Sequence, residues 1–249
     1  MAQRLLSRRI VGEKCTWGDT AMIRVNVLAE GQSEMKFAKD TLNNFFMGNP
    51  IIDARCVLTG RDSRTNYEHR GGLVSYAKAK NDIMRWLNED KTAYVTTMFD
   101  FFRLPTDFPN YEYAMTCDNH RGSVERLERA MLADIPSALA RRFIPYIQLH
   151  EFESLLFTDI RVLKADYLDE RDAAAIDSLY EDTKSMMPED INHGATTAPS
   201  KRLMNAIDYR KGDFPVSWLN TITVPKIKER CQHFAAWINK LSNLQKIHQ

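Results

Sequence analysis

Acidic side chains stand where three predicted strands end: Glu30, Asp100, and the pair Glu151 and Glu153. Parallel strands deliver their carboxyl ends to one edge of a sheet, so these residues are expected to meet in one cleft. Clustered carboxylates raise one another's pKa unless a cation neutralises them. Oxygen ligands without cysteine favour Mg²⁺ or Mn²⁺ over zinc. Because such ions orient phosphate and activate water, the pattern predicts phosphate chemistry.

Glu34 adds an acid close to the first of these strands. The strand runs into Glu30 and Gly31, and a helix with Ser33 as its predicted N-cap follows. Glu30 and Glu34 would then lie close enough to share one hard cation. The alternative is that Glu34 is a first-turn acid favoured by the helix dipole and Glu30 a solvated turn residue.

The other acids also have structural alternatives. Asp100 could cap a turn after its strand. One of Glu151 and Glu153 is expected to be only a first-turn residue, because alternate residues at a helix start point in different directions. His150 could bind a metal or transfer a proton, but a lone histidine at a strand end is more often a hydrogen-bonded core residue.

A second unusual stretch, 192–202, leads into a predicted helix with Ser200 at its start and Lys201 and Arg202 in its first turn. Cations oppose the helix dipole there unless an anion is bound nearby. Ser200, Lys201 and Arg202 are therefore candidates for binding a substrate phosphate; the alternative is a solvated first turn. Three charged residues of the polar loop 59–72 could also meet a substrate, although most such loops are merely solvated: Arg61, Asp62 and Arg64.

The elements that must position these residues alternate between strand and helix up to residue 158, and the chain is largely helical after it. Alternation predicts βαβ units with right-handed crossovers, and hence an α/β fold of three layers with a mostly parallel sheet. We expect an N-terminal extension at 1–21, an α/β domain at 22–158 and a helical C-terminal region packed on it at 159–249. The predicted strands are 23–30, 51–58, 93–99 and 143–149, and the main predicted helices are 33–47, 73–89, 122–134, 152–157 and 224–241.

Composition narrows the class of protein. The 249-residue chain carries a net charge of +1, so nucleic-acid binding would need a local patch or a partner subunit. Its 4 cysteines show no CxxC spacing, which argues against zinc and disulfides and favours a reducing cytoplasm. No apolar run approaches the roughly 18 to 20 residues of a membrane helix, and residues 1–21 do not resemble a secretory signal.

Four segments together resemble a known family: Leu28-Ala-Glu-Gly-Gln-Ser-Glu34, Thr97-Met-Phe-Asp100-Phe-Phe, Gln148-Leu-His-Glu-Phe-Glu-Ser154 and Ala198-Pro-Ser-Lys-Arg202. They are similar to the uncharacterised bacterial "domain of unknown function 4276" family, over roughly residues 22–241. The resemblance implies a Toprim-like fold, the α/β metal-binding fold of topoisomerases, primases and OLD-family nucleases. It also implies an AAA or ABC-type ATPase partner, often within a defence gene cluster.

The resemblance also assigns residues. Glu30 and Glu34 match the Toprim glutamate and the Glu-Gly-x-x-Glu form of OLD-family nucleases, and Asp100 matches the first acid of the Toprim Asp-x-Asp. The chain departs from the pattern at Phe102, which replaces the second acid. Glu151 or Glu153 could supply the missing oxygen from the neighbouring strand.

The leading hypothesis is therefore a Toprim-like nuclease subunit that cuts DNA or RNA with Mg²⁺ or Mn²⁺ bound by Glu30, Asp100 and Glu153 or Glu151. Glu34 would bind a second ion or orient water, and the cations after Ser200 would hold the substrate phosphate. The alternative is a non-catalytic subunit that docks on the ATPase and senses nucleic acid or a phage component. A third hypothesis is nucleotidyl transfer or phosphatase activity on small phosphates. Each of the three hypotheses allows the chain to form a homo-oligomer.

Overall fold

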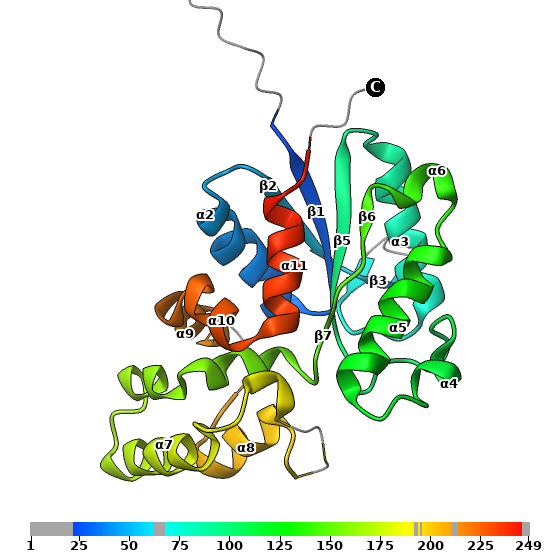
Figure 1. Cartoon of the computed structure of the whole chain (residues 1–249). Helices are drawn as coiled ribbons and strands as arrows, with labels where there is room; N and C mark the ends of the chain where they lie inside the picture. Colours follow the sequence, from blue (N-terminus) through cyan, green and yellow to red (C-terminus); the bar gives the residue numbers. More distant parts are fainter. Residues whose placement is uncertain (1–21, 62–67, 192–193, 195, 211–213, 246–249) are drawn as a thin grey trace, which may run out of the picture.

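A parallel sheet of five strands forms the centre of the computed structural model, which describes residues 22–61, 68–191, 194, 196–210 and 214–245. The strand order is β2-β1-β5-β6, and β7 pairs with β5 beyond the end of β6 (Figure 1). The strands of this sheet are β1 (Arg24–Ala29), β2 (Ile51–Cys56), β5 (Ala93–Asp100), β6 (Phe143–Ile144) and β7 (Ile147–Gln148). The predicted α/β class with a mostly parallel sheet is confirmed.

The central strands β1 and β5 are largely buried, as expected for inner strands of a parallel sheet that helices cover on both faces. Val27 and Met98 belong to one apolar cluster, whereas Leu28 and Phe99 belong to a second. Successive side chains of a strand point to opposite faces, so the two clusters lie on opposite sides of the sheet. The molecule therefore has three layers.

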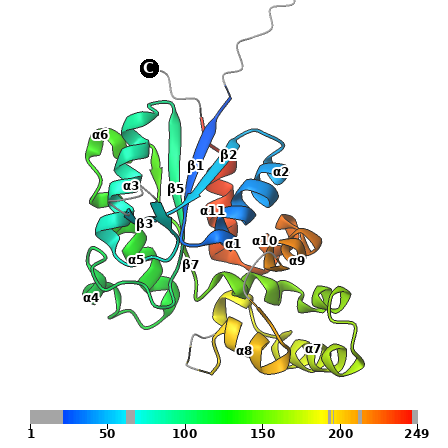
Figure 2. The same cartoon turned by 180° about the vertical axis from the view of Figure 1, so that it is seen from behind.

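Helices cover both faces of the sheet (Figures 1 and 2). One face is covered by α1 (Gln32–Lys36), η1 (Phe37–Leu42), α2 (Asn43–Phe46) and α11 (Gln232–Ser242). The other is covered by α3 (Tyr76–Glu89), α4 (Tyr111–Ala114), α5 (His120–Ala133) and α6 (Ser137–Ala140).

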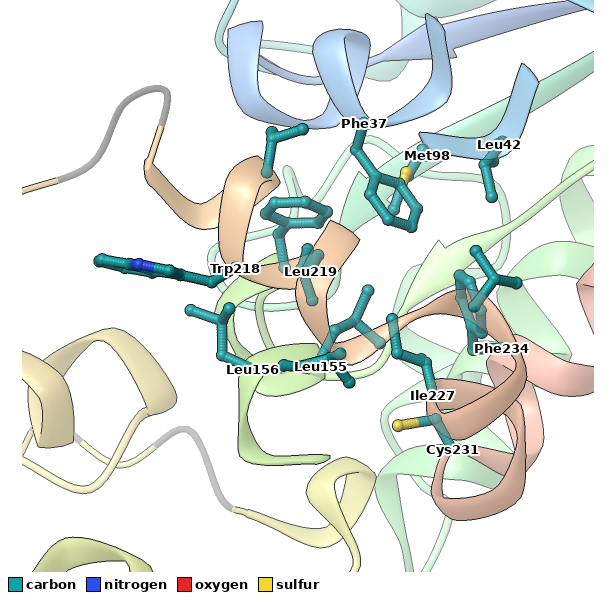
Figure 3. Packing of buried hydrophobic residues seen from close by; sticks show 14 of the residues in the cluster. Phe37, Leu42, Met98, Leu155, Leu156, Trp218, Leu219, Ile227, Cys231 and Phe234 are labelled. Carbon is teal, nitrogen blue, oxygen red and sulfur yellow. The ribbon is translucent and has the colours of Figure 1, made fainter. Parts of the chain in front are cut away.

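The C-terminal elements share a core with the sheet. Figure 3 shows Phe37, Leu155, Leu219 and Phe234 converging in one cluster, and this cluster extends across the predicted domain boundary at residue 158. The remaining elements are the hairpin strands β3 (Leu58–Arg61) and β4 (Glu68–Arg70), followed by η2 (Phe152–Thr158), η3 (Ile160–Ala165), α7 (Glu170–Thr183), η4 (Pro188–Asp190), α8 (Pro199–Ala206), α9 (Phe214–Ile222) and α10 (Val224–Arg230).

Several predicted elements are divided in the structure. The strand predicted at 143–149 becomes β6 and β7, because Pro145 lacks the amide needed to continue a strand ladder. The helix predicted at 224–241 breaks at Cys231, whose backbone is extended. The helix predicted at 33–47 contains a π-helical segment, the helix at 152–157 is a 3₁₀ helix, and the loop predicted at 59–72 includes the β3–β4 hairpin.

A buried ion pair joins α5 to α11. His233 Nε2 lies 2.9 Å from Glu128 Oε1, and Tyr146 stacks on the imidazole with 5.3 Å between ring centroids. Burial alone would lower the pKa of His233, but the hydrogen bond and the charge of Glu128 outweigh it and raise this pKa above its ordinary value. The imidazole therefore binds its proton more tightly in the folded chain than in the unfolded chain.

This raised pKa predicts a pH-dependent contribution to stability. The contribution is fully present below the unfolded pKa of 6.5 and is lost as pH rises through the folded pKa. In chemical denaturation, wild type should exceed His233→Gln in free energy of unfolding by more at about pH 6 than at about pH 8.5. A difference that stays constant over this range would contradict the prediction.

Candidate functional site

Glu30 and Asp100 meet at the carboxyl edge of the sheet, as predicted. They follow or end the adjacent strands β1 and β5, in which Ala29 pairs with Met98. The Glu30 amide extends this ladder by donating to the Met98 carbonyl at 3.0 Å. The Asp100 amide in turn donates to Glu30 Oε2 at 3.0 Å. The Glu30 carboxylate is therefore held against the backbone of Asp100.

Asp100 also anchors the segment that carries the remaining acids. Its Oδ1 accepts a hydrogen bond of 2.9 Å from the amide of Phe152, the residue between Glu151 and Glu153. The side chains of Asp100, Glu151 and Glu153 are all buried. Parallel pairing of β5 with β7 brings this segment to the same edge of the sheet. A metal site shared by the side chains of these acids stays a prediction.

Glu34 closes a capping box at the start of α1. Its Oε2 accepts a 3.0 Å hydrogen bond from the Gly31 amide, and the side chain is buried. Gly31, not Ser33, is the N-cap residue, so the predicted N-cap was wrong by two positions. The helix begins earlier than predicted because the Glu34 carboxylate binds the Gly31 amide, which is the half of a capping box that needs no side chain at the N-cap. A role for Glu34 in binding a second ion stays a prediction.

Gly31→Ala is expected to disturb this capping box. A Cβ at Gly31 would lie 2.9 Å from Glu34 Oε2, so the carboxylate would have to move away from the amide that it caps. We expect a loss of about 1 kcal/mol in the free energy of unfolding, the usual effect of losing an N-terminal cap. Urea denaturation measures it, and Glu34→Gln, which can keep the capping geometry, should lose less. Equal stability of Gly31→Ala and wild type would contradict the prediction.

The anion expected at the start of α8 is Glu151. Ser200 donates to this carboxylate twice, from its amide to Oε2 and from its hydroxyl to Oε1, both at 2.9 Å. Ser200 is itself buried. An internal carboxylate therefore satisfies the helix N-terminus, whose two cations had suggested a bound phosphate. Phosphate binding by Ser200, Lys201 and Arg202 stays a prediction.

Glu153 points into the C-terminal region. Its Oε1 accepts a 3.1 Å hydrogen bond from the hydroxyl of Tyr209, which follows α8. Burial and the charge of Glu153 raise the pKa of Tyr209, so its hydroxyl remains a proton donor. Glu151 and Glu153 thus fix α8 and the chain after it to the carboxyl edge of the sheet.

A histidine pair lies beside the same edge. His150, buried and with a left-handed backbone at φ +64°, has Nε2 3.0 Å from the carbonyl oxygen of Glu189. Since a carbonyl only accepts, Nε2 carries the proton. The ring of His120 lies 5.1 Å from that of His150, and burial lowers the pKa of His120.

These two histidines line a cavity of about 440 Å³. His120, from the start of α5, and Glu189, from η4, were not identified from the sequence as site residues. Neither residue belongs to a sequence motif, because His120 and Glu189 reach the cavity only through the packing of α5 and η4 near the end of β7. The strained backbone of His150 is a common feature of functional sites.

Glu30 and Asp100 are the two acids that contact each other directly at this edge, through the Asp100 amide. Among the residues that the structure describes, no three histidine, cysteine, aspartate or glutamate side chains are placed to hold a metal ion together. Mg²⁺ is commonly bound by one or two carboxylates, with water and substrate phosphate completing its shell, so Glu30 and Asp100 fit such an ion. Asp62 and Arg64, and the side chain of Arg61, lie outside the described residues.

The fold is α/β, and its candidate site is the group of acidic residues at the carboxyl ends of the parallel strands. The family described as "Domain of unknown function (DUF4276)" matches residues 29–242, so the chain belongs to this family. No curated protein and no solved structure matches it. None of the helices that the structure describes has the length and apolar character needed to span a membrane.

Proposed function

We propose that this protein is a divalent-metal-dependent phosphodiesterase of Toprim-like type that cuts DNA or RNA. The single observation that carries the proposal is the 3.0 Å hydrogen bond from the Asp100 amide to the Glu30 carboxylate, at the carboxyl ends of adjacent parallel strands. This is the position where open α/β sheets place their ligands.

Glu30 and Asp100 would hold one Mg²⁺ or Mn²⁺. Each carboxylate has one oxygen fixed by a backbone amide, and hydrogen bonds of this kind orient metal-binding carboxylates. A bound ion would polarise a phosphodiester and activate water. Glu153, whose Oε1 accepts the hydrogen bond from Tyr209, would complete the metal site. Lys201 would hold the substrate phosphate.

A partner subunit is part of the proposal. The net charge of +1 gives the chain no general attraction for nucleic acid, so a partner would supply it. The resemblance noted in the sequence favours an AAA or ABC-type ATPase in a bacterial defence system of the cytoplasm. A partner of this kind would deliver the nucleic acid to the acidic edge.

Incubation with supercoiled DNA, linear DNA and RNA tests the proposal. We expect cleavage by the full chain in Mg²⁺ or Mn²⁺, with the neighbouring ATPase present, and none in EDTA. Cleavage that persists in EDTA would contradict a metal-dependent reaction. Absence of cleavage with every substrate, metal and partner, by a protein shown to be folded, would contradict hydrolysis itself.

Phe102 favours a second candidate function, a non-catalytic subunit that docks on the ATPase. This residue stands where the Toprim pattern has its second acid, and its amide donates to the His150 carbonyl at 2.7 Å. In this case Glu30→Gln and Asp100→Asn should leave phage protection intact while the complex with the ATPase still forms. Loss of protection in both variants, with the complex retained, would exclude this alternative.

A further inference from the structure

A second cavity, of about 440 Å³, opens along the edge strand β6, between α5 and α11. Figure 1 shows β6 lying between these two helices. Its volume is within the range of about 300 to 1,000 Å³ that is usual for small-molecule sites. The cavity is lined by one face of each helix and by the edge strand, and its charged lining residues are Glu125, Glu128, Arg129 and Lys240.

The cavity wall carries a hydrogen-bond acceptor, the carboxylate of Glu128. Both hydrogen bonds that Glu128 accepts, from the Ile147 amide and from His233, go to its Oε1 at 2.9 Å. No residue in the described part of the chain donates to Glu128 Oε2, so this oxygen keeps its capacity to accept a hydrogen bond.

The cavity also carries two cations. Lys240 lies two turns after His233, the partner of Glu128, which is about 10 Å along the axis of α11. Arg129 follows Glu128 on α5, and both cations are exposed. Trp237, Phe143 and Pro145 add apolar surface to the wall. A ligand that fits would therefore have a hydrogen-bond donor, a planar apolar body and an anion.

We propose that this cavity is a nucleotide-binding site. The base would lie against the apolar wall and donate an amino hydrogen to Glu128 Oε2, and Arg129 and Lys240 would bind the phosphate. Charge-assisted hydrogen bonds to phosphate are stronger than neutral ones, so these two cations supply much of the affinity. Neither Glu30 nor Asp100 lines this cavity, so the proposal does not rest on the hydrolytic function.

Titration calorimetry of the full chain with adenosine and guanosine monophosphate tests this site, in EDTA so that no metal assists binding elsewhere. We expect one nucleotide per chain. The double variant Arg129→Ala, Lys240→Ala should bind about tenfold more weakly or worse, because it removes two charged contacts. Ala236→Phe, which fills the cavity from an exposed position of α11, should also lose binding.

Two matched controls separate this site from others. Lys226→Ala removes an exposed lysine of α10 that does not line the cavity, and Glu30→Gln alters the sheet edge; both should bind like wild type. No binding of either nucleotide by folded wild type would overturn the proposal. Equal binding by the double variant or by Ala236→Phe, or loss of binding in Glu30→Gln, would also overturn it, because the ligand would then lie elsewhere.

Discussion

Glu30→Gln and Asp100→Asn are each expected to lower nucleic-acid cleavage by about 10²- to 10³-fold, because each removes one charged ligand of the proposed cation. Both substitutions keep the size of the side chain and an oxygen acceptor. The amides of Asp100 and Phe152 therefore retain their hydrogen bonds. Initial rates of plasmid or RNA cleavage in Mg²⁺ measure the effect.

The matched control is Glu181→Gln. Glu181 is an exposed acid of α7 that pairs with Lys184, so the same chemical change is made away from the sheet edge. We expect wild-type cleavage from this variant. Wild-type cleavage by Glu30→Gln and Asp100→Asn as well would show that the carboxylate pair binds no catalytic cation.

The meeting of Glu30 and Asp100 could be predicted from the sequence because it depends only on strand polarity. Runs of strand length that alternate with helices along the chain, two of them ending in Glu30 and Asp100, imply parallel strands with these acids at one edge. The register of β1 and β5 bears this out. The class of the fold follows from the same alternation.

The partner of each acid could not be predicted in this way. Glu151 is bound by Ser200, which lies 49 residues further along the chain, and Glu153 by Tyr209, 56 residues away. Such contacts depend on how α8 packs against η2, and no local periodicity encodes that packing. The two cations after Ser200 did indicate an anion, but not that the anion is a side chain of the same chain.

The breaks in predicted elements have a similar origin. The apolar stripe of the predicted C-terminal helix continues through Cys231, so periodicity alone joins α10 and α11. The carboxylate of Glu189 makes the division possible, because it accepts hydrogen bonds from the amides of His233 and Phe234 at 2.9 and 2.8 Å. A distant acid thus supplies the N-terminal cap that the local sequence lacks.

Glu189→Ala should therefore be strongly destabilising. The carboxylate is buried, and besides the two amides of α11 it accepts a 3.2 Å hydrogen bond from the guanidinium of Arg121. Its removal leaves both amides unsatisfied and Arg121 without this carboxylate. We expect a loss of about 3 to 5 kcal/mol in the free energy of unfolding, measured by urea denaturation.

Two further variants show whether capping causes this loss. Glu189→Gln keeps one oxygen acceptor at the N-terminus of α11 but no charge for Arg121, so it should lose less stability than Glu189→Ala. Glu181→Ala, the same truncation at an exposed ion pair, should change stability by less than about 1 kcal/mol. If Glu189→Ala were no more destabilising than Glu181→Ala, the start of α11 would depend on its apolar packing and not on the carboxylate. The start of α11 would then be held by the cluster around Phe234 and by the pair of His233 with Glu128.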